Sequence, residues 1–190
     1  MSACQPVATP LEEGLKLSVD PNQVPVDKGR YQRLVGRLMY LAHTRPDLAY
    51  ALSVVSQYMH DPGKHRMNAV IRILRYLKGS PGKGILFKKN NHLRVEGYID
   101  ADWAGSVDDR RSTSGYFTFV GGNLVTWRSK KQNVVARSSA EAEYRVLTDL
   151  PHQKRFLEII AGVITNLERE LLCVESSVLL CTVVTQACSV

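Results

Sequence analysis

The chain has 190 residues, of which 44% are hydrophobic, so it can bury the core of one large or two small domains, and a wholly disordered chain is not expected. Its net charge is +7, and the excess lies in residues 1–144, which hold 21 basic and 13 acidic side chains. A positive field there suits a phosphate-backbone partner, although a basic protein without such a partner has the same charge.

Membrane and secreted proteins are not expected. No window approaches the roughly 20 apolar residues of a membrane span. Prolines and glutamates occupy the N-terminal region where a secretory signal has its apolar core. The four cysteines form no Cys-x-x-Cys pair. We therefore expect a reduced intracellular compartment, cytoplasmic or nuclear.

Residues 1–28 contain several turn-forming residues and little periodicity, which predicts an extended lead-in. Residues 29–92 contain three stretches of helical periodicity, over 31–42, 47–60 and 65–78. We expect a small bundle in which Thr44 and Asp47 cap the second helix and Gly79 ends the third. Its basic side chains either follow a duplex backbone or form an ordinary solvated face. They are Arg72, Arg75, Lys78, Lys83, Lys88 and Lys89.

Residues 93–150 are predicted to form a sheet followed by a helix. A short strand over 84–88 and a hairpin tip at 88–91 are expected to precede it. Three strands are then predicted, over 94–102, 112–120 and 124–128. Gly121-Gly122-Asn123 predicts a tight turn between the last two, and Ser138 with Glu141 predicts a capping box at the helix start. An antiparallel meander and a helix packed across it indicate an α+β domain.

Carboxylates mark both ends of this domain. Asp100 and Asp102 share one face of the first strand, and alternation alone does not choose between them. On a helical wheel Glu143 falls within the apolar arc, so we expect it on the buried stripe, where a carboxylate needs a partner or a metal. The arc is formed by Ala140, Tyr144, Val146, Leu147 and Leu150. Mg²⁺ takes hard oxygen ligands, usually one or two carboxylates plus substrate phosphates.

Basic residues flank these strands at their loops. The functional interpretation is phosphate contacts that hold a nucleic acid over the acidic positions, and the alternative is ordinary hairpin polarity. The residues are Arg110, Arg111, Arg128, Lys130 and Lys131.

Four ordered blocks resemble the ribonuclease H region of copia-type LTR-retrotransposon polyproteins. They are Asp100-Ala101-Asp102-Trp103-Ala104-Gly105, Arg110-Arg111-Ser112-Thr113-Ser114-Gly115-Tyr116, Ser129-Lys130-Lys131-Gln132 and Ser138-Ser139-Ala140-Glu141-Ala142-Glu143-Tyr144. Upstream blocks such as Arg75-Tyr76-Leu77-Lys78-Gly79 resemble the end of the reverse transcriptase and its connection to the nuclease. The resemblance runs from about Thr9 to Leu147.

The resemblance implies a helical connection segment over 29–92 and a partial RNase-H-like domain over 93–150. It implies Mg²⁺ as cofactor, an RNA–DNA hybrid as substrate and the rest of a retrotransposon polymerase as a partner. In the family pattern Asp100 supplies the first catalytic and metal ligand and Glu143 the second, with Asp102 as the alternative metal ligand.

The pattern breaks after Leu147. The family's third carboxylate lies on a fourth strand, and Thr182 stands where that Asp is wanted. We expect residues 151–190 to form a divergent tail, helical and then poorly ordered. Two or three carboxylates would bind Mg²⁺ weakly, so hydrolysis of hybrid RNA is expected to be weak or lost. The alternatives are a non-catalytic nucleic-acid-binding module and a non-functional truncated product.

Overall fold

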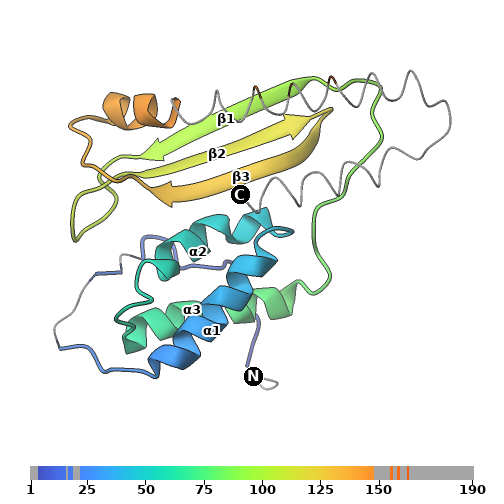
Figure 1. Ribbon diagram of the computed structural model, residues 1–190. Helices are drawn as coiled ribbons and strands as arrows, with labels where there is room; N and C mark the ends of the chain where they lie inside the picture. Colours follow the sequence, from blue (N-terminus) through green and yellow to red (C-terminus); the bar gives the residue numbers. More distant parts are fainter. Residues whose placement is uncertain are drawn as a thin grey trace. The chain divides into compact units, whose positions relative to one another are not determined.

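The computed structural model describes residues 4–15, 17–18, 22–147 and the single positions 155, 158 and 162. The chain divides into two compact units (Figure 1). The first comprises Met1–Gly84 and Gly105–Arg110, and the second comprises Ile85–Ala104 and the chain from Arg111 onward. The predicted tail over 151–190 lies almost wholly outside the described residues.

The first unit is built on a small group of helices, as the periodicity predicted. Their bounds are α1 Lys28–Leu41, η1 Pro46–Leu48, α2 Ala49–Ser56 and α3 Lys64–Gly79. Each α-helix contributes fully buried side chains to one core, including Val35, Val55 and Ile73. Asp27 begins α1, because its carboxylate accepts a hydrogen bond of 3.0 Å from the Arg30 N–H.

The predicted cap of the second helix is wrong. The Thr44 hydroxyl donates back to the Leu41 carbonyl at the end of α1, at 3.1 Å, and the Asp47 carboxylate binds Arg45. The predicted helix over 47–60 becomes the short η1 followed by α2, which ends at Ser56. Arg45, which precedes the helix, binds the Asp47 carboxylate, so this carboxylate does not form the predicted cap.

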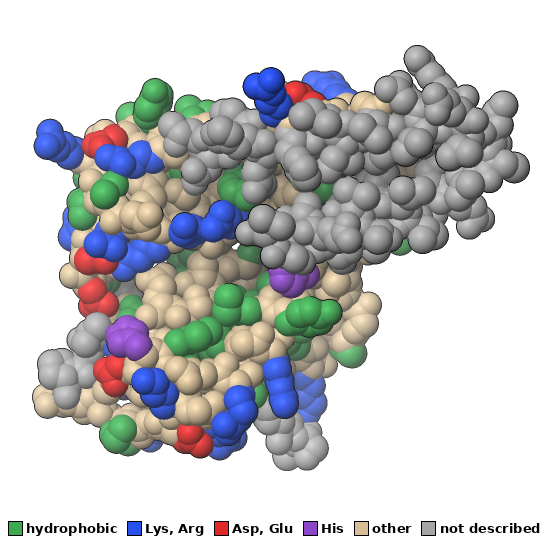
Figure 2. All heavy atoms as spheres, viewed as in Figure 1, with side chains coloured by type: hydrophobic (Ala, Val, Ile, Leu, Met, Phe, Trp, Pro, Cys, Tyr) green, Lys and Arg blue, Asp and Glu red, His purple; other side chains and the backbone are tan. Residues whose placement is uncertain are grey.

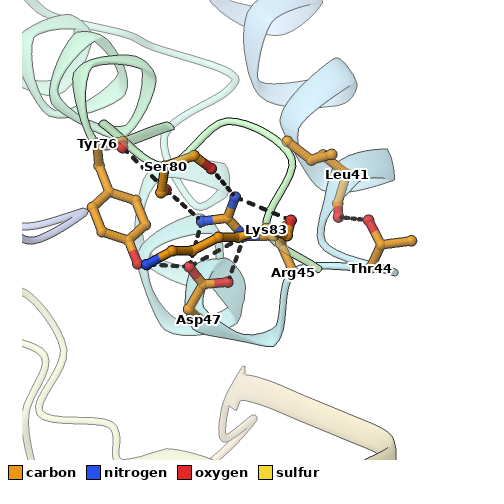
Figure 3. Close-up of polar contacts among 7 residues, drawn as sticks. All are labelled: Leu41, Thr44, Arg45, Asp47, Tyr76, Ser80 and Lys83. Carbon is orange, nitrogen blue, oxygen red and sulfur yellow. Dashed lines mark hydrogen bonds and ion pairs between the residues drawn. The ribbon is translucent and has the colours of Figure 1, made fainter. Parts of the chain in front are cut away.

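Arg45 is a buried cation that joins η1 to the end of α3 (Figure 3). Its Nη2 lies 2.7 Å from Asp47 Oδ2, and its Nη1 donates to the Ser80 carbonyl at 3.1 Å. The Tyr76 hydroxyl donates to the same carboxylate at 2.7 Å. The hydrogen bond from Arg45, with that from Tyr76, holds the pKa of Asp47 below its ordinary value.

A second buried cation attaches the N-terminal lead-in to the helices. Arg66 is 2% exposed, and its guanidinium lies 4.2 Å from the centre of the Tyr58 ring. It donates to the Ser18 carbonyl at 2.7 Å, and the Tyr58 hydroxyl donates to Leu17 at the same distance. The Tyr58 hydroxyl also donates to Asp108, at 3.4 Å. Residues 105–110, which connect two strands of the second unit, are thereby linked to this core.

The second unit contains the predicted antiparallel meander. Its strands are β1 Val95–Asp102, β2 Thr113–Val120 and β3 Asn123–Lys131, in the order β1-β2-β3. Gly121 and Gly122 form the turn with φ values of 55° and 74°, a backbone conformation that favours glycine. The architecture is therefore mixed α/β with an open three-stranded sheet, consistent with a partial domain.

The strand predicted over 84–88 and the hairpin tip at 88–91 do not form. The segment instead attaches to the β2–β3 turn through the side chains of Asn123 and Asn90, the latter donating to the Gly121 carbonyl. The Lys88 N–H donates to Asn123 Oδ1 at 2.7 Å, and Asn123 Nδ2 donates to the Lys88 carbonyl at 2.9 Å. The amide of Asn123 thus supplies the donor and acceptor that a neighbouring strand would have provided.

The two faces of the sheet differ in burial. One face is covered and carries Tyr116, Thr118, Val120 and Val125, all nine-tenths or more buried. The other carries Tyr98 stacked on Phe117 with ring centres 5.1 Å apart, and these side chains are 49% and 42% exposed. Within the described residues, no helix combines the length and apolar character needed to cross a membrane.

Candidate nucleic-acid interface

The helix that follows the sheet, residues 139–147, begins at the predicted capping box. Ser138 Oγ accepts from the Glu141 N–H at 3.1 Å, which confirms half of the motif. The Glu141 carboxylate accepts from the N–H of Arg137, one residue before the expected partner, at 2.8 Å. This bond, with a second from Arg145 at 2.7 Å, holds the pKa of Glu141 below its ordinary value.

The predicted buried stripe of this helix is confirmed for Val146 and is wrong for Tyr144, Leu147 and Glu143, while Leu150 lies outside the described residues. Ala142 and Val146 are the buried positions, at 0% and 1% exposure. Tyr144 and Leu147 are 67% and 47% exposed, and Glu143 is exposed as well. The wheel weighted the large apolar side chains, whereas close packing against a sheet favours the small Ala142.

The register sets the positions of the acidic residues relative to the helix. Directly paired residues project to one face of a sheet, and successive residues alternate. Asp100 pairs with Gly115 and Asp102 with Thr113, whereas Ser114 pairs with Ala101 on the opposite face. The helix is tied to that opposite face, because Gln132 Nε2 donates to Ser114 Oγ and to the Ala142 carbonyl, both at 2.9 Å.

The structure therefore brings Asp100 and Asp102 together on one face but does not bring them to the face on which the helix of Glu143 packs. Within the described part of the chain, no three His, Cys, Asp or Glu side chains form a group that could hold a metal ion. The catalytic and metal roles of Asp100, Asp102 and Glu143 stay predictions.

Two of the three predicted basic residues of β3 line a pocket of about 290 Å³ between the strand end and the helix. They are Lys130 and Lys131, and Arg145 joins them from the helix. The lining is completed by Ser114, Gln132, Asn133 and Val134. Three cationic side chains, two amides and a hydroxyl meet here, and no carboxylate belongs to the described lining. Arg145 is paired with Glu141 beside the pocket, and Gln132 Nε2 is used by Ser114 and Ala142, so the lysine ammonium groups are the donors best suited to an anion.

The other predicted basic residues do not line this pocket. Arg128 pairs with Tyr116 in the sheet, two residues before Lys130. Arg110 is the last residue of the segment 105–110, which belongs to the first unit, and its φ is 57°. The second unit resumes at Arg111. Lys and Arg side chains are spread over the face seen in Figure 2, with fewer acidic side chains among them.

The sequence interpretation missed Arg145 and Asn133. Arg145 lies four residues after Glu141 and pairs with it, which from sequence has the appearance of an ordinary surface pair on a helix. Asn133 directly follows the block Ser129-Lys130-Lys131-Gln132. Its position next to this block was the one feature of the sequence that could have indicated it.

Comparison with known proteins gives matches over most of the chain. It is 46% identical over 167 residues to the retrovirus-related Pol polyprotein from transposon RE2 of Arabidopsis thaliana, covering 88% of this chain and 11% of the relative. It is 44% identical over 170 residues to the Pol polyprotein from transposon TNT 1-94 of Nicotiana tabacum, covering 83% of this chain and 13% of the relative.

A shorter relative, the secreted RxLR effector protein 161 of Plasmopara viticola, is 45% identical over 130 residues, which are 68% of this chain and 92% of that protein. No family model matches the chain, and no solved structure matches it. The chain spans about a tenth of the length of the transposon polyproteins that it matches. It belongs to the family of retrovirus-related Pol polyproteins of copia-type transposons, of which it represents a fragment.

Proposed function

We propose that this fragment is a nucleic-acid-binding, partial RNase-H-like module whose ligand is an RNA–DNA hybrid. The observation that carries the proposal is the pocket lined by Lys130, Lys131 and Arg145. Phosphate oxygens accept charge-assisted hydrogen bonds from such side chains, and Arg can bind them in a bidentate manner. The +7 net charge adds a long-range attraction to any polyanion.

We propose that hydrolysis of the RNA strand is weak or lost. Two-metal cleavage of a phosphodiester requires ions about 3.5–4 Å apart, clamped on the attacking and leaving oxygens. Asp100 and Asp102 share a face and are the proposed ligands of one weakly held Mg²⁺, with Glu143 as the proposed second catalytic carboxylate. Asp100 and Asp102 lie on the face of the sheet opposite to the one to which the helix of Glu143 is tied, which supports the proposal that these groups form no two-metal centre. The missing acidic groups would come from the rest of a retrotransposon polymerase.

Binding is tested with the double substitution Lys130→Gln and Lys131→Gln. We expect its affinity for a labelled RNA–DNA hybrid to fall about tenfold, because two contacts of roughly 0.7 kcal/mol each are lost. Fluorescence anisotropy at low salt measures the dissociation constants.

The matched control is the pair Lys88→Gln and Lys89→Gln. These lysines are exposed in the same unit, and Lys88 is attached to the β2–β3 turn, at the other end of β3 from the pocket. The control removes the same charge and should lower affinity by less than about threefold. Equal losses for the two pairs would show that only net charge attracts the hybrid.

Cleavage is tested by incubating the chain with hybrid and Mg²⁺. We expect no cleavage above the background of the double variant Asp100→Asn and Glu143→Gln, because the described acidic groups do not assemble a two-metal centre. Mg²⁺-dependent cleavage that is lost in Asp100→Asn or in Glu143→Gln would contradict the proposal and restore the nuclease interpretation.

A further inference from the structure

One side of α3 carries a row of hydrogen-bond donors. His65, Asn68, Arg72 and Arg75 recur at helical spacing, and the buried residues Ala69 and Ile73 lie on the inner side of the same helix. The four donors line a pocket of about 380 Å³ together with Glu12, Leu15, Ala69 and Ile71. This pocket lies within the first unit, in which the lead-in packs beside α3.

The lead-in occupies the basic side of α3 with oxygen atoms. Arg72 Nη1 lies 3.1 Å from Glu12 Oε1, and Arg72 Nη2 donates to Thr9 Oγ1 at 3.0 Å. Arg75 Nε donates to the Gln5 carbonyl at 2.7 Å, and Lys78 Nζ donates to the Cys4 carbonyl at 2.9 Å. Three of the six basic side chains that were predicted either to follow a duplex or to form a solvated face thus each bind an oxygen of residues 4–12.

These contacts leave the site incompletely satisfied. Among the described residues, none accepts a hydrogen bond from Arg72 Nε, although solvent does not reach this atom. The side chain of Glu12 is 63% exposed, whereas that of Arg72 is 23% exposed. An exposed carboxylate paired with a half-buried guanidinium is screened by salt and readily replaced. A phosphate group brings more acceptor oxygens and more charge than one carboxylate.

We infer that α3 carries a second phosphate-backbone site, formed by Arg72, Arg75 and Lys78, which residues 4–12 of the same chain occupy with Glu12 in the place of a phosphate. The inference rests on the proposed function for its ligand, a nucleic acid. It differs in its residues, because the pocket of Lys130 and Lys131 belongs to the other unit. Nucleic acid and the lead-in therefore compete for the same donors.

The test is Glu12→Gln, which removes the competing charge without altering α3. We expect the affinity for a labelled RNA–DNA hybrid at about 50 mM salt to rise about two- to fivefold, the range that corresponds to loss of an exposed ion pair. The slope of log affinity against log salt should steepen by about 0.9, the value for one added phosphate contact in a duplex.

The matched control is Glu13→Gln, the same change at the adjacent exposed residue. It alters net charge equally but not the contact with Arg72, so its gain in affinity should be smaller and its salt slope unchanged. In a chain that carries Glu12→Gln, the further change Arg72→Gln should remove the gain. Equal effects of Glu12→Gln and Glu13→Gln, or a gain that survives Arg72→Gln, would overturn the inference.

This outcome is separable from the proposed function. Loss of binding on changing Lys130 and Lys131, with no gain from Glu12→Gln, would leave the proposed function intact and reject the α3 site. A gain in affinity from Glu12→Gln, with no loss on changing Lys130 and Lys131, would support the α3 site and reject the pocket as the binding site. Absence of hybrid binding in every variant at low salt would reject both.

Discussion

Raising the salt concentration from about 50 to about 200 mM is expected to lower the affinity of this chain for an RNA–DNA hybrid by about 40-fold. The factor corresponds to three phosphate contacts, made by Lys130, Lys131 and Arg145, each contributing about 0.9 to the slope of log affinity against log salt. Bound counterions are released when these side chains neutralise phosphates, and added salt opposes that release. Titrations at several salt concentrations measure the slope directly.

The same titration separates the pocket from general basicity. Lys130→Gln with Lys131→Gln should reduce the slope by about 1.8, so the loss over the same salt range shrinks to about threefold to fourfold. The control pair Lys88→Gln and Lys89→Gln should leave the slope near its original value. A slope unchanged by the first pair would mean that these lysines make no phosphate contacts.

Arg45→Ala is expected to lower the free energy of unfolding by about 2–3 kcal/mol, less than for a fully buried ion pair, because the Asp47 side chain is 35% exposed and water solvates part of its charge. The substitution removes donors to Asp47, to the Ser80 hydroxyl and to the Ser80 carbonyl. These groups meet where η1 joins the end of α3, and Arg45 itself is only 4% exposed. Urea denaturation followed by circular dichroism measures the change.

Arg37→Ala is the matched control for this prediction. Arg37 lies on the exposed side of α1, so the same substitution should change stability by about 0.5 kcal/mol or less. Arg45→Lys should also be destabilising, because an ammonium cannot reproduce the fork that binds Asp47 through Nε and Nη2. The experiment also bears on the possibility of a non-functional product. A cooperative transition in the unsubstituted chain excludes a poorly folded one.

The sheet was predictable because its determinants are local. Alternating strands and two adjacent glycines at a turn are visible in the sequence, and the meander follows from them. The predicted strand over 84–88 does not form, because the backbone of Lys88 pairs with the side chain of Asn123, 35 residues further along the chain. The cap of the second helix failed because Arg45 binds the carboxylate of Asp47, and the buried position of Arg45 depends on the tertiary fold.

The candidate site was predictable to a similar extent. Lys130 and Lys131 were found because they are adjacent and follow a strand, and the structure places both in one pocket. Arg145 reaches that pocket from a helix, and the wheel misjudged which side of the helix faces the sheet. Strand alternation assigned Asp100 and Asp102 to one face correctly, but it carried no information on which face the helix would cover.

Residues 105–110 have a practical implication for dissecting the protein. The connection between β1 and β2 leaves the second unit and contributes to the first, where Asp108 accepts from Tyr58. A fragment that stops at residue 84 therefore lacks part of the helical unit, and a fragment that starts at residue 85 carries that part without its core. To express the first unit separately, residues 105–110 have to be joined to it in a rearranged gene or added as a peptide.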